Sequence, residues 1–193
     1  MGYTTWFTGG LEFDKPVSEE LAKYIEEFSL VRHMKRDVEK IKEIYPNWQE
    51  LCFNGELGID GEYFIGGGCW DNIPGTKTHD ESIVNGNHTG GSCPGLWCQW
   101  IIEENELVWD QGEKFYEYDA WLIYLIKNFI APSGYKLNGK IEFQGEDEDD
   151  FGTICVVDNE VEVKYGMRIM DLSEIDTNTL IAELTSRGYT VQN

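Results

Sequence analysis

The first pattern along the chain that specifies an element is helical. Four apolar residues fall at positions i, i+3, i+4 and i+7, a spacing that places them on one helix face: Leu21, Tyr24, Ile25 and Phe28. Ser18 comes just before this run and is a favourable N-cap, and two acidic residues follow it in the first turn. The pattern therefore predicts a helix that begins at Ser18 and buries one face.

Three more helices are predicted farther along. A short one begins around Val38 and ends before Pro46, because the residue before a proline avoids the helical region. The strongest covers residues 113–130, where Phe115 and several later apolar residues share a wide face. The last begins near Thr177, in the C-terminal tail.

Alternating and continuous apolar runs predict the strands. An N-terminal hairpin is expected, in which residues 3–8 pair with residues 11–13 across a turn at Gly9-Gly10. Further strands are predicted at residues 62–65, 96–102, 107–109, 140–144, 153–157 and 161–165. The last three of these form an antiparallel meander. The stretch 71–95 is predicted to be a long loop, a feature that is usually functional or mobile.

Helices and strands alternate without the βαβ rhythm of a parallel sheet. The expected fold class is therefore α+β, an antiparallel sheet with helices packed mainly on one face. Residues 1–165 are predicted to form a single α+β domain, and residues 166–193 a C-terminal appendage with one short helix.

Charge is the strongest feature of the composition. The chain has 36 acidic and 15 basic residues among 193, and its formal net charge is −21. Such a surface repels phosphate backbones and anionic membranes, which argues against direct binding to nucleic acid or to a membrane. It attracts basic protein surfaces instead. A simpler reading, that the acidity only keeps a small protein soluble, stays open.

The five cysteines are odd in number and contain no CxxC pair, a usage that is typical of a reducing cytoplasm. The N-terminus resembles no signal peptide, and the longest apolar run is too short to cross a bilayer. The protein is therefore expected to be soluble and cytoplasmic. The spacing of Cys69, His88 and Cys93 matches no structural zinc class, so neither a metal nor another cofactor is predicted.

The densest charge of the chain is a run of five adjacent carboxylates between two predicted strands. The run consists of Glu146, Asp147, Glu148, Asp149 and Asp150. Their mutual repulsion and the cost of burial require that these side chains face water. The run lacks the alternate acids and the central glycine of a calcium-binding EF-hand loop. It is interpreted either as a solvated turn or as a surface that binds a basic partner.

A basic cluster stands out against the acidic background. Arg32, Lys35 and Arg36 would contact the phosphate of a small ligand such as a nucleotide signal, and Trp97 and Trp100 would stack on its base. Arg32 and Arg36 would share one face if the segment were helical. The simpler reading is that these cations pair with the chain's own carboxylates.

No standard catalytic, metal or nucleotide motif occurs in the chain. His88 lies near Ser92 and Cys93, as a base lies near a nucleophile, but the segment matches no recognised nucleophile motif. The triple glycine that begins at Gly66 offers backbone N–H groups to an anion, yet it lacks the rest of a phosphate-binding loop. The sequence therefore favours binding over catalysis and predicts no catalytic residue. An enzyme of unknown reaction remains the third hypothesis.

Several short segments together resemble one protein family. They are Gly2-Tyr3-Thr4-Thr5 and residues 28–37, 94–100, 113–116, 121–126, 137–139, 144–150, 152 and 158–159. Across residues 2–165 the chain resembles a group of short, largely uncharacterised proteins of phages and bacterial genomes. The resemblance implies a setting and carries no activity or catalytic residue. Small acidic phage proteins often bind a host protein and inhibit it, and some of them block defence systems or mimic the charge of DNA.

The leading hypothesis is therefore a phage-type acidic protein that stoichiometrically inhibits a host factor. Its partner would be a host protein with a basic surface, met in the host cytoplasm. Its role would be comparable to that of anti-CRISPR or DNA-mimic proteins. The binder of a small phosphate-bearing ligand is the alternative.

Overall fold

The computed structural model describes residues 2–67 and 80–166 and the single positions 181 and 185. The elements are β1 (Thr5–Phe13), α1 (Glu19–Ser29), β2 (Met34–Arg36), α2 (Val38–Ile44), the 3-10 helices η1 (Trp48–Leu51) and η2 (Ile59–Gly61), β3 (Ile83–Thr89), β4 (Trp100–Glu103), β5 (Glu106–Trp109), α3 (Tyr118–Leu125), the π-helix η3 (Ile126–Ile130), β6 (Leu137–Gly145), β7 (Phe151–Val157) and β8 (Glu160–Tyr165). The helix predicted near Thr177, and with it most of the appendage 166–193, lies outside the described residues.

Six antiparallel strands form the main sheet, in the order β4-β5-β1-β6-β7-β8. The long central pair is β1 and β6, whose register runs from Thr5 opposite Gly145 to Phe13 opposite Leu137. Buried and exposed residues alternate along β1, so the sheet has one core face and one open face. The predicted C-terminal meander is confirmed as β6-β7-β8.

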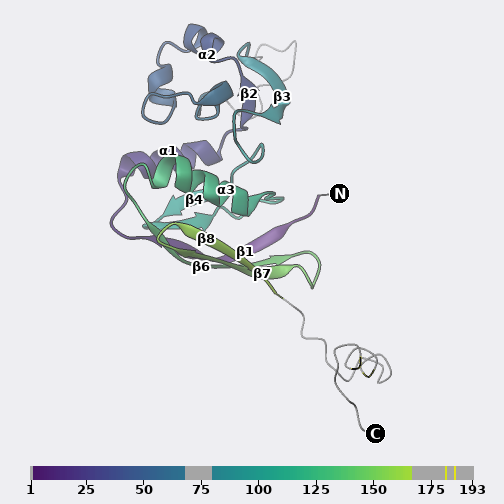
Figure 1. The fold of residues 1–193 in the computed structure, drawn as a ribbon. Helices are drawn as coiled ribbons and strands as arrows, with labels where there is room; N and C mark the ends of the chain where they lie inside the picture. The colour runs from purple at the N-terminus through teal and green to yellow at the C-terminus, as the bar shows by residue number, and fades with distance from the viewer. Residues whose placement is uncertain (1, 68–79, 167–180, 182–184, 186–193) are drawn as a thin grey trace.

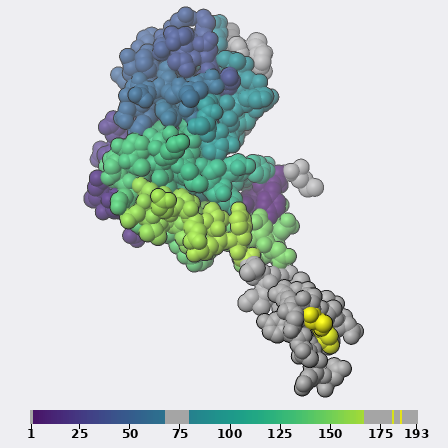
Figure 2. All heavy atoms as spheres, viewed as in Figure 1, coloured from purple at the N-terminus to yellow at the C-terminus, as the bar shows by residue number. Residues whose placement is uncertain are grey.

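Among the described elements, helices cover only the core face of this sheet (Figure 1). In Figure 1, α1 and α3 lie over that face, and α2 with the β2–β3 pair forms a further layer beyond the helices. The space-filling view shows that this outer layer sits directly on the helix layer (Figure 2). The predicted fold class, α+β with helices mainly on one face, is confirmed. None of the described helices has the length and apolar character needed to cross a membrane.

The core is rich in aromatic residues. Trp100, Trp121, Phe28 and Phe129 are among its largest fully buried side chains. The rings of Phe28 and Trp121 meet edge to face at 6.0 Å, a favourable arrangement for aromatic pairs. Most of the aromatic content of the sequence is therefore explained by packing between the sheet and the helices.

The N-terminal helix predictions hold. The Ser18 hydroxyl accepts a hydrogen bond from the Leu21 N–H at 3.3 Å and caps α1, as the sequence predicts. Asp37 caps α2 by accepting from the N–H groups of Glu39 and Lys40. These caps satisfy backbone donors that have no partner inside the first turn of a helix.

The N-terminal hairpin prediction is wrong, because β1 runs straight through Gly9 and Gly10 and pairs with β6 along its whole length. Gly9 has a φ of +98°, and a Cβ there would lie 2.6 Å from the carbonyl oxygen of Lys140 in β6. The glycines therefore permit a close approach of two strands, where the sequence suggested a turn.

Three other predicted segments change. Residues 62–65 form a turn and coil after η2, so the strand predicted there is wrong. The loop predicted for 71–95 is wrong where β3 forms and pairs with β2, while residues 68–79 lie outside the described part. The strand predicted at 96–102 begins only at Trp100.

The helix predicted for 113–130 begins five residues late, at Tyr118. Lys114 and Glu117 have left-handed backbone conformations, with φ of 62° and 54°, and these break the helical path. Phe115 consequently lies outside the helix, yet it is buried in the core at 2% exposure. Its apolar character indicated burial correctly but not the element that carries it.

Candidate functional site

The acidic run forms the loop between β6 and β7, and this loop is closed by its own backbone. The Gly145 N–H donates to the Asp150 carbonyl at 2.6 Å, and the Asp150 N–H donates to the Asp147 carbonyl at 3.0 Å. A side chain at Gly145 would collide with the Asp150 carboxylate and the Tyr3 hydroxyl. Glycine is therefore required where the loop folds back on the sheet.

The N-terminal segment holds the loop from one side. The Tyr3 hydroxyl donates to the Asp150 carboxylate at 2.6 Å and accepts from the Asp147 N–H at 3.2 Å. The Thr4 N–H donates to the Glu146 carboxylate at 2.9 Å. The hydrogen bond to Asp150 raises the pKa of the Tyr3 phenol, which therefore stays protonated as a donor at neutral pH.

The side chain of Gln144, at the end of β6, also holds this loop. Its side-chain amide lies within 2.9 Å of the Asp147 carbonyl, 3.1 Å of the Gly145 carbonyl and 3.2 Å of the Asp150 carbonyl. Asp147, Glu148 and Asp149 point to solvent as exposed residues. Glu146 is exposed as well, so the loop presents four exposed acidic residues on a backbone that protein contacts fix in shape.

Exposed aromatic side chains border the loop. Trp6 is 50% exposed, Tyr116 54% and Tyr165 64%. The Tyr116 hydroxyl accepts a hydrogen bond from the Tyr3 N–H at 3.1 Å. Trp6 lies opposite Gln144 in the sheet register, and Gln144 lies opposite Phe151. Aromatic rings such as these are enriched at protein-binding surfaces, and the neighbouring carboxylates add complementarity to a basic partner.

This end of the sheet brings together three segments that the sequence singled out separately: Gly2–Thr5, Glu113–Tyr116 and Gln144–Asp150. A side chain at Gly2 would strike the aliphatic part of Lys114, which shows how closely the first two segments approach. We call the surface of the 146–150 loop with Trp6, Tyr116 and Tyr165 the acidic–aromatic end. The first segment lies more than a hundred residues before the other two, so sequence reasoning could not reveal this convergence.

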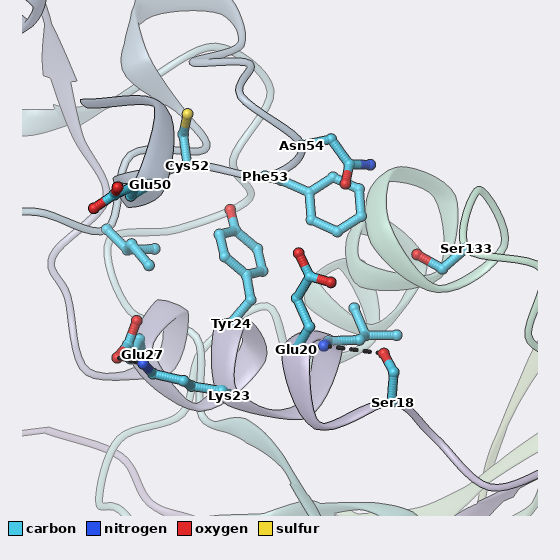
Figure 3. Close-up of a pocket in the computed structure, with 12 residues that line it drawn as sticks. Ser18, Glu20, Lys23, Tyr24, Glu27, Glu50, Cys52, Phe53, Asn54 and Ser133 are labelled. Carbon is cyan, nitrogen blue, oxygen red and sulfur yellow. Dashed lines mark hydrogen bonds and ion pairs between the residues drawn. The ribbon is translucent and has the colours of Figure 1, made fainter. Parts of the chain in front are cut away.

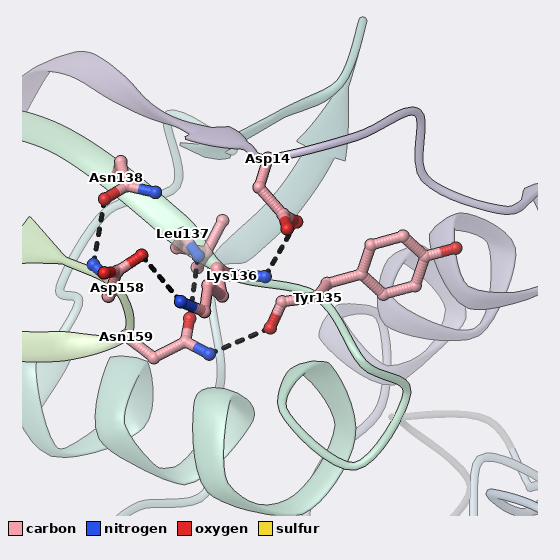
Figure 4. A network of polar contacts seen from close by, with 7 residues as sticks. All are labelled: Asp14, Tyr135, Lys136, Leu137, Asn138, Asp158 and Asn159. Carbon is pink, nitrogen blue, oxygen red and sulfur yellow. Dashed lines mark hydrogen bonds and ion pairs between the residues drawn. The ribbon is translucent and has the colours of Figure 1, made fainter.

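The segments 137–139 and 158–159 meet at the opposite end of the sheet (Figure 4). The Asn138 side chain accepts from the Asp158 N–H at 2.8 Å, and the Asn159 side chain accepts from the Leu137 N–H at 2.7 Å. The Asn159 amide also donates to the Tyr135 carbonyl at 2.9 Å. These bonds fasten the β7–β8 turn to the start of β6, a structural role.

The basic cluster does not gather into one site. Arg36 is 4% exposed and forms a buried ion pair with Asp80, and its guanidinium also donates to the Ser82 hydroxyl at 2.8 Å. Lys35 pairs with Asp60 at 3.3 Å. Residues 34–36 form a strand and Arg32 precedes it without regular structure, so the helical condition for a face shared by Arg32 and Arg36 is not met.

The two tryptophans of the alternative ligand site also lie in different environments. Trp100 is fully buried, and its indole N–H donates to the Tyr118 carbonyl at 2.8 Å. Trp97 is half-buried beneath the guanidinium of Arg32, whose Cζ lies 5.7 Å from the ring centroid. The Arg32 Nε–H donates to the Gly86 carbonyl at 3.1 Å.

The glycine-rich loop near His88 encloses a carboxylate of the chain itself. Glu62, 4% exposed, accepts from the Ser92 N–H at 2.8 Å and from the Ser92 hydroxyl at 3.0 Å. The Tyr124 hydroxyl donates to the same carboxylate at 3.1 Å.

Burial raises the pKa of the Cys93 thiol to about 12, so it is protonated at neutral pH and is a poor nucleophile. Exposed His88 has no hydrogen bond to Ser92 or Cys93 among the described contacts.

The triple glycine that begins at Gly66 also lies beside a carboxylate of the chain itself. A side chain at Gly67 would lie 3.0 Å from the Asp80 carboxylate and 3.1 Å from the Tyr45 hydroxyl, so the chain's own anion lies beside this glycine. Gly66 packs against the Phe64 ring, and Gly68 lies outside the described residues. Within the described part of the chain, no group of three His, Cys, Asp or Glu residues is placed to hold a metal ion.

A pocket of about 240 Å³ lies between α1 and residues 50–54 (Figure 3). The rings of Tyr24 and Phe53, with centroids 5.2 Å apart, line it, and glutamates stand at its rim. The Tyr24 hydroxyl is committed to the Tyr63 carbonyl at 2.9 Å. Burial raises the pKa of the Cys52 thiol to about 11, which keeps it protonated. The pocket therefore offers apolar and acidic walls without an activated nucleophile.

Comparison with known proteins adds no assignment to these sites. A search finds no protein-family model, no curated protein and no solved structure that matches the chain.

Proposed function

We propose that the protein is a binding protein that occupies a basic surface of a protein partner through its acidic–aromatic end. One observation carries this proposal: protein contacts hold the 146–150 loop in a fixed shape while Asp147, Glu148 and Asp149 remain exposed. A merely solvated turn needs no such framework of hydrogen bonds. A preordered loop loses less conformational freedom on binding, which favours affinity.

The charge of the whole molecule supports the same partner chemistry. At −21, the protein attracts a basic partner over long range and increases the rate of encounter. The exposed rings of Trp6, Tyr116 and Tyr165 would then supply the apolar contact that charge alone lacks. Trp6 stands on the open face of the sheet, and Tyr165 stands on the core-face side in the row of Phe7 and Phe143, so exposed rings flank the loop on both faces.

The resemblance to small phage and bacterial proteins suggests the biological setting of this binding. In our proposal the partner is a host protein in the cytoplasm, and stoichiometric occupation of its basic surface inhibits it. Nucleic-acid enzymes and defence nucleases have such surfaces, because they bind phosphate backbones. Counter-defence by DNA mimicry is therefore the form of inhibition that we propose.

The test begins with capture of a partner from host lysate at low and at high salt, with identification by mass spectrometry. The purified partner is then titrated with the protein and with the loop-neutralised variant D147N/E148Q/D149N. We expect this variant to lose about tenfold or more in affinity at low salt, because three exposed carboxylates are removed.

The matched control is E12Q/E103Q/E160Q, which removes the same number of charges from exposed positions elsewhere on the sheet. It should change the affinity about twofold at most, through the loss of general steering alone. Equal affinity of the loop-neutralised variant and the unaltered protein would exclude the 146–150 loop as the binding surface. Failure to retain any partner at low salt would count against the binding function itself.

A further inference from the structure

Trp6 lies on the open face of the sheet beside the acidic loop. It is half exposed, and its cross-strand neighbours in the same row are Gln144 in β6 and Phe151 in β7. Gln144 is the residue whose amide binds the loop carbonyls. Two residues before Trp6, the Thr4 N–H holds the Glu146 carboxylate at 2.9 Å. The Glu146 carboxylate is thereby held against the chain two residues before the indole of Trp6.

Trp6, Phe151 and Gln144 line a hollow on this face, together with Glu142 and Lys164. The cations of the face are already paired with neighbouring carboxylates. Lys164 contacts Glu162 at 2.9 Å, and Lys140 contacts Glu142 at 2.7 Å. The net charge that a visiting group meets here is therefore set by the acidic loop.

The chain places its own cations over other aromatic rings. Four rings in the described part have a Lys or Arg above them: those of Tyr135, Trp97, Phe64 and Trp48. Trp6 is not among these rings, although it stands beside carboxylates. The combination of an exposed ring and adjacent negative charge is what a cationic side chain from outside the protein requires.

We propose that Trp6 anchors an arginine side chain of a basic protein partner, whose guanidinium stacks on the indole and donates to the Glu146 carboxylate. This inference rests on the proposed function and names the chemistry that the acidic–aromatic end recognises. Arginine fits better than lysine because its planar guanidinium both stacks on a ring and donates two parallel hydrogen bonds to a carboxylate. An ammonium group is a compact, strongly hydrated charge that does neither as well.

The test uses two probes of equal charge, a hexa-arginine peptide and a hexa-lysine peptide, titrated by calorimetry at matched ionic strength. For the unaltered protein we expect the arginine peptide to bind about fivefold tighter, the factor that an exposed cation–π contact supplies. In Trp6→Leu this preference should disappear. Leucine keeps an apolar residue on the open face, so the fold is retained.

Val157→Ala is the matched control, an exposed apolar residue on the same face at the other end of the sheet, and it should keep the preference for arginine. Loop neutralisation with D147N/E148Q/D149N should weaken both peptides equally. If both peptides bind with one affinity, and Trp6→Leu matches the unaltered protein, the anchor is excluded while the acidic binding function survives. If loop neutralisation also leaves both affinities unchanged, the proposed function fails with it.

Discussion

At the scale of single residues, His33 links burial to pH. It is 4% exposed, and the centroid of its ring lies 4.0 Å from that of the tilted Phe28 ring and 5.0 Å from that of Trp121. Loss of solvation on burial lowers the pKa of its imidazole to about 3, and a hydrogen bond with the Phe28 backbone opposes this shift only in part. Burial of a charge without a partner is costly, so the folded protein keeps His33 neutral.

This depressed pKa predicts a loss of stability in mild acid. The unfolded chain binds a proton at His33 below about pH 6.5 while the folded chain does not, so the free energy of unfolding falls as the pH decreases. From about pH 7.5 to about pH 5 the contribution of His33 amounts to roughly 2 kcal/mol. Urea unfolding at several pH values measures it.

His33→Leu provides the comparison for that measurement, because it removes the titrating group and keeps an apolar side chain. The difference in unfolding free energy between the unaltered protein and this variant should change with pH by the same amount. Parallel pH profiles for the two proteins would show that His33 titrates alike in both states.

The sequence predicts the environment of a residue where the residue's own charge and its immediate neighbours determine it. It does not identify a contact partner that lies far away in the chain. Adjacent carboxylates repel one another, so the exposure of Asp147 to Asp149 followed from the sequence alone. Pairing of the basic cluster with the chain's own carboxylates is confirmed for Lys35 and Arg36, but the partner of Arg36, Asp80, lies 44 positions away and could not be named from the sequence. The clamp on Asp150 depends on Tyr3, 147 positions away. No local pattern contains such contacts, so the framework of the candidate site could not be predicted.

At the scale of elements, the central strands β1 and β6 show what the glycine pair does. A Cβ at Gly9 would meet the Lys140 carbonyl oxygen at 2.6 Å, and the φ of +98° disfavours any other residue. We therefore expect Gly9→Ala to destabilise the protein by about 2–3 kcal/mol, the sum of backbone strain and displaced strand pairing. Urea unfolding at neutral pH measures the loss.

Gly55→Ala distinguishes backbone strain from displacement of the neighbouring strand. Gly55 also has a positive φ, +75°, but a Cβ there would meet nothing within 4 Å. Only the backbone penalty applies, so the expected loss is about 1 kcal/mol. If both variants lose the same stability, strand proximity is not the reason for glycine at position 9.

Element predictions followed the strength of their periodic signals. The helix after Ser18 and the C-terminal meander have regular apolar spacing and formed as predicted. The Gly9-Gly10 pair was misread because glycine marks both turns and close strand contacts, and only the partner strand distinguishes them. The late start of α3 has a similar origin, since the left-handed conformations of Lys114 and Glu117 leave no mark in residue type.

At the scale of the whole molecule, the charge of −21 opposes folding. The described ion pairs on the surface, such as Lys23 with Glu27 at 3.7 Å, are exposed and contribute little. Compaction brings the unpaired carboxylates closer together, so the folded state carries more self-repulsion than the unfolded chain. Salt should therefore stabilise this protein.

Salt should therefore have opposite effects on the stability of this protein and on its affinity for a basic partner. The last prediction tests both effects together. Raising the ionic strength from about 0.02 M to about 0.5 M shortens the Debye length from about 20 Å to about 4 Å. The Tm should rise by about 2–4 °C for each 1 kcal/mol of repulsion that is screened, and differential scanning calorimetry measures it. Under the same conditions the affinity for a basic partner should fall, because screening weakens the attraction as well. If the complex dissociates while the Tm of the acidic protein rises, the dissociation comes from screening of the electrostatic contact and not from unfolding. A Tm that falls along with the affinity would show that high salt destabilises the protein, and salt-sensitive capture would then no longer be specific evidence for the acidic–aromatic end.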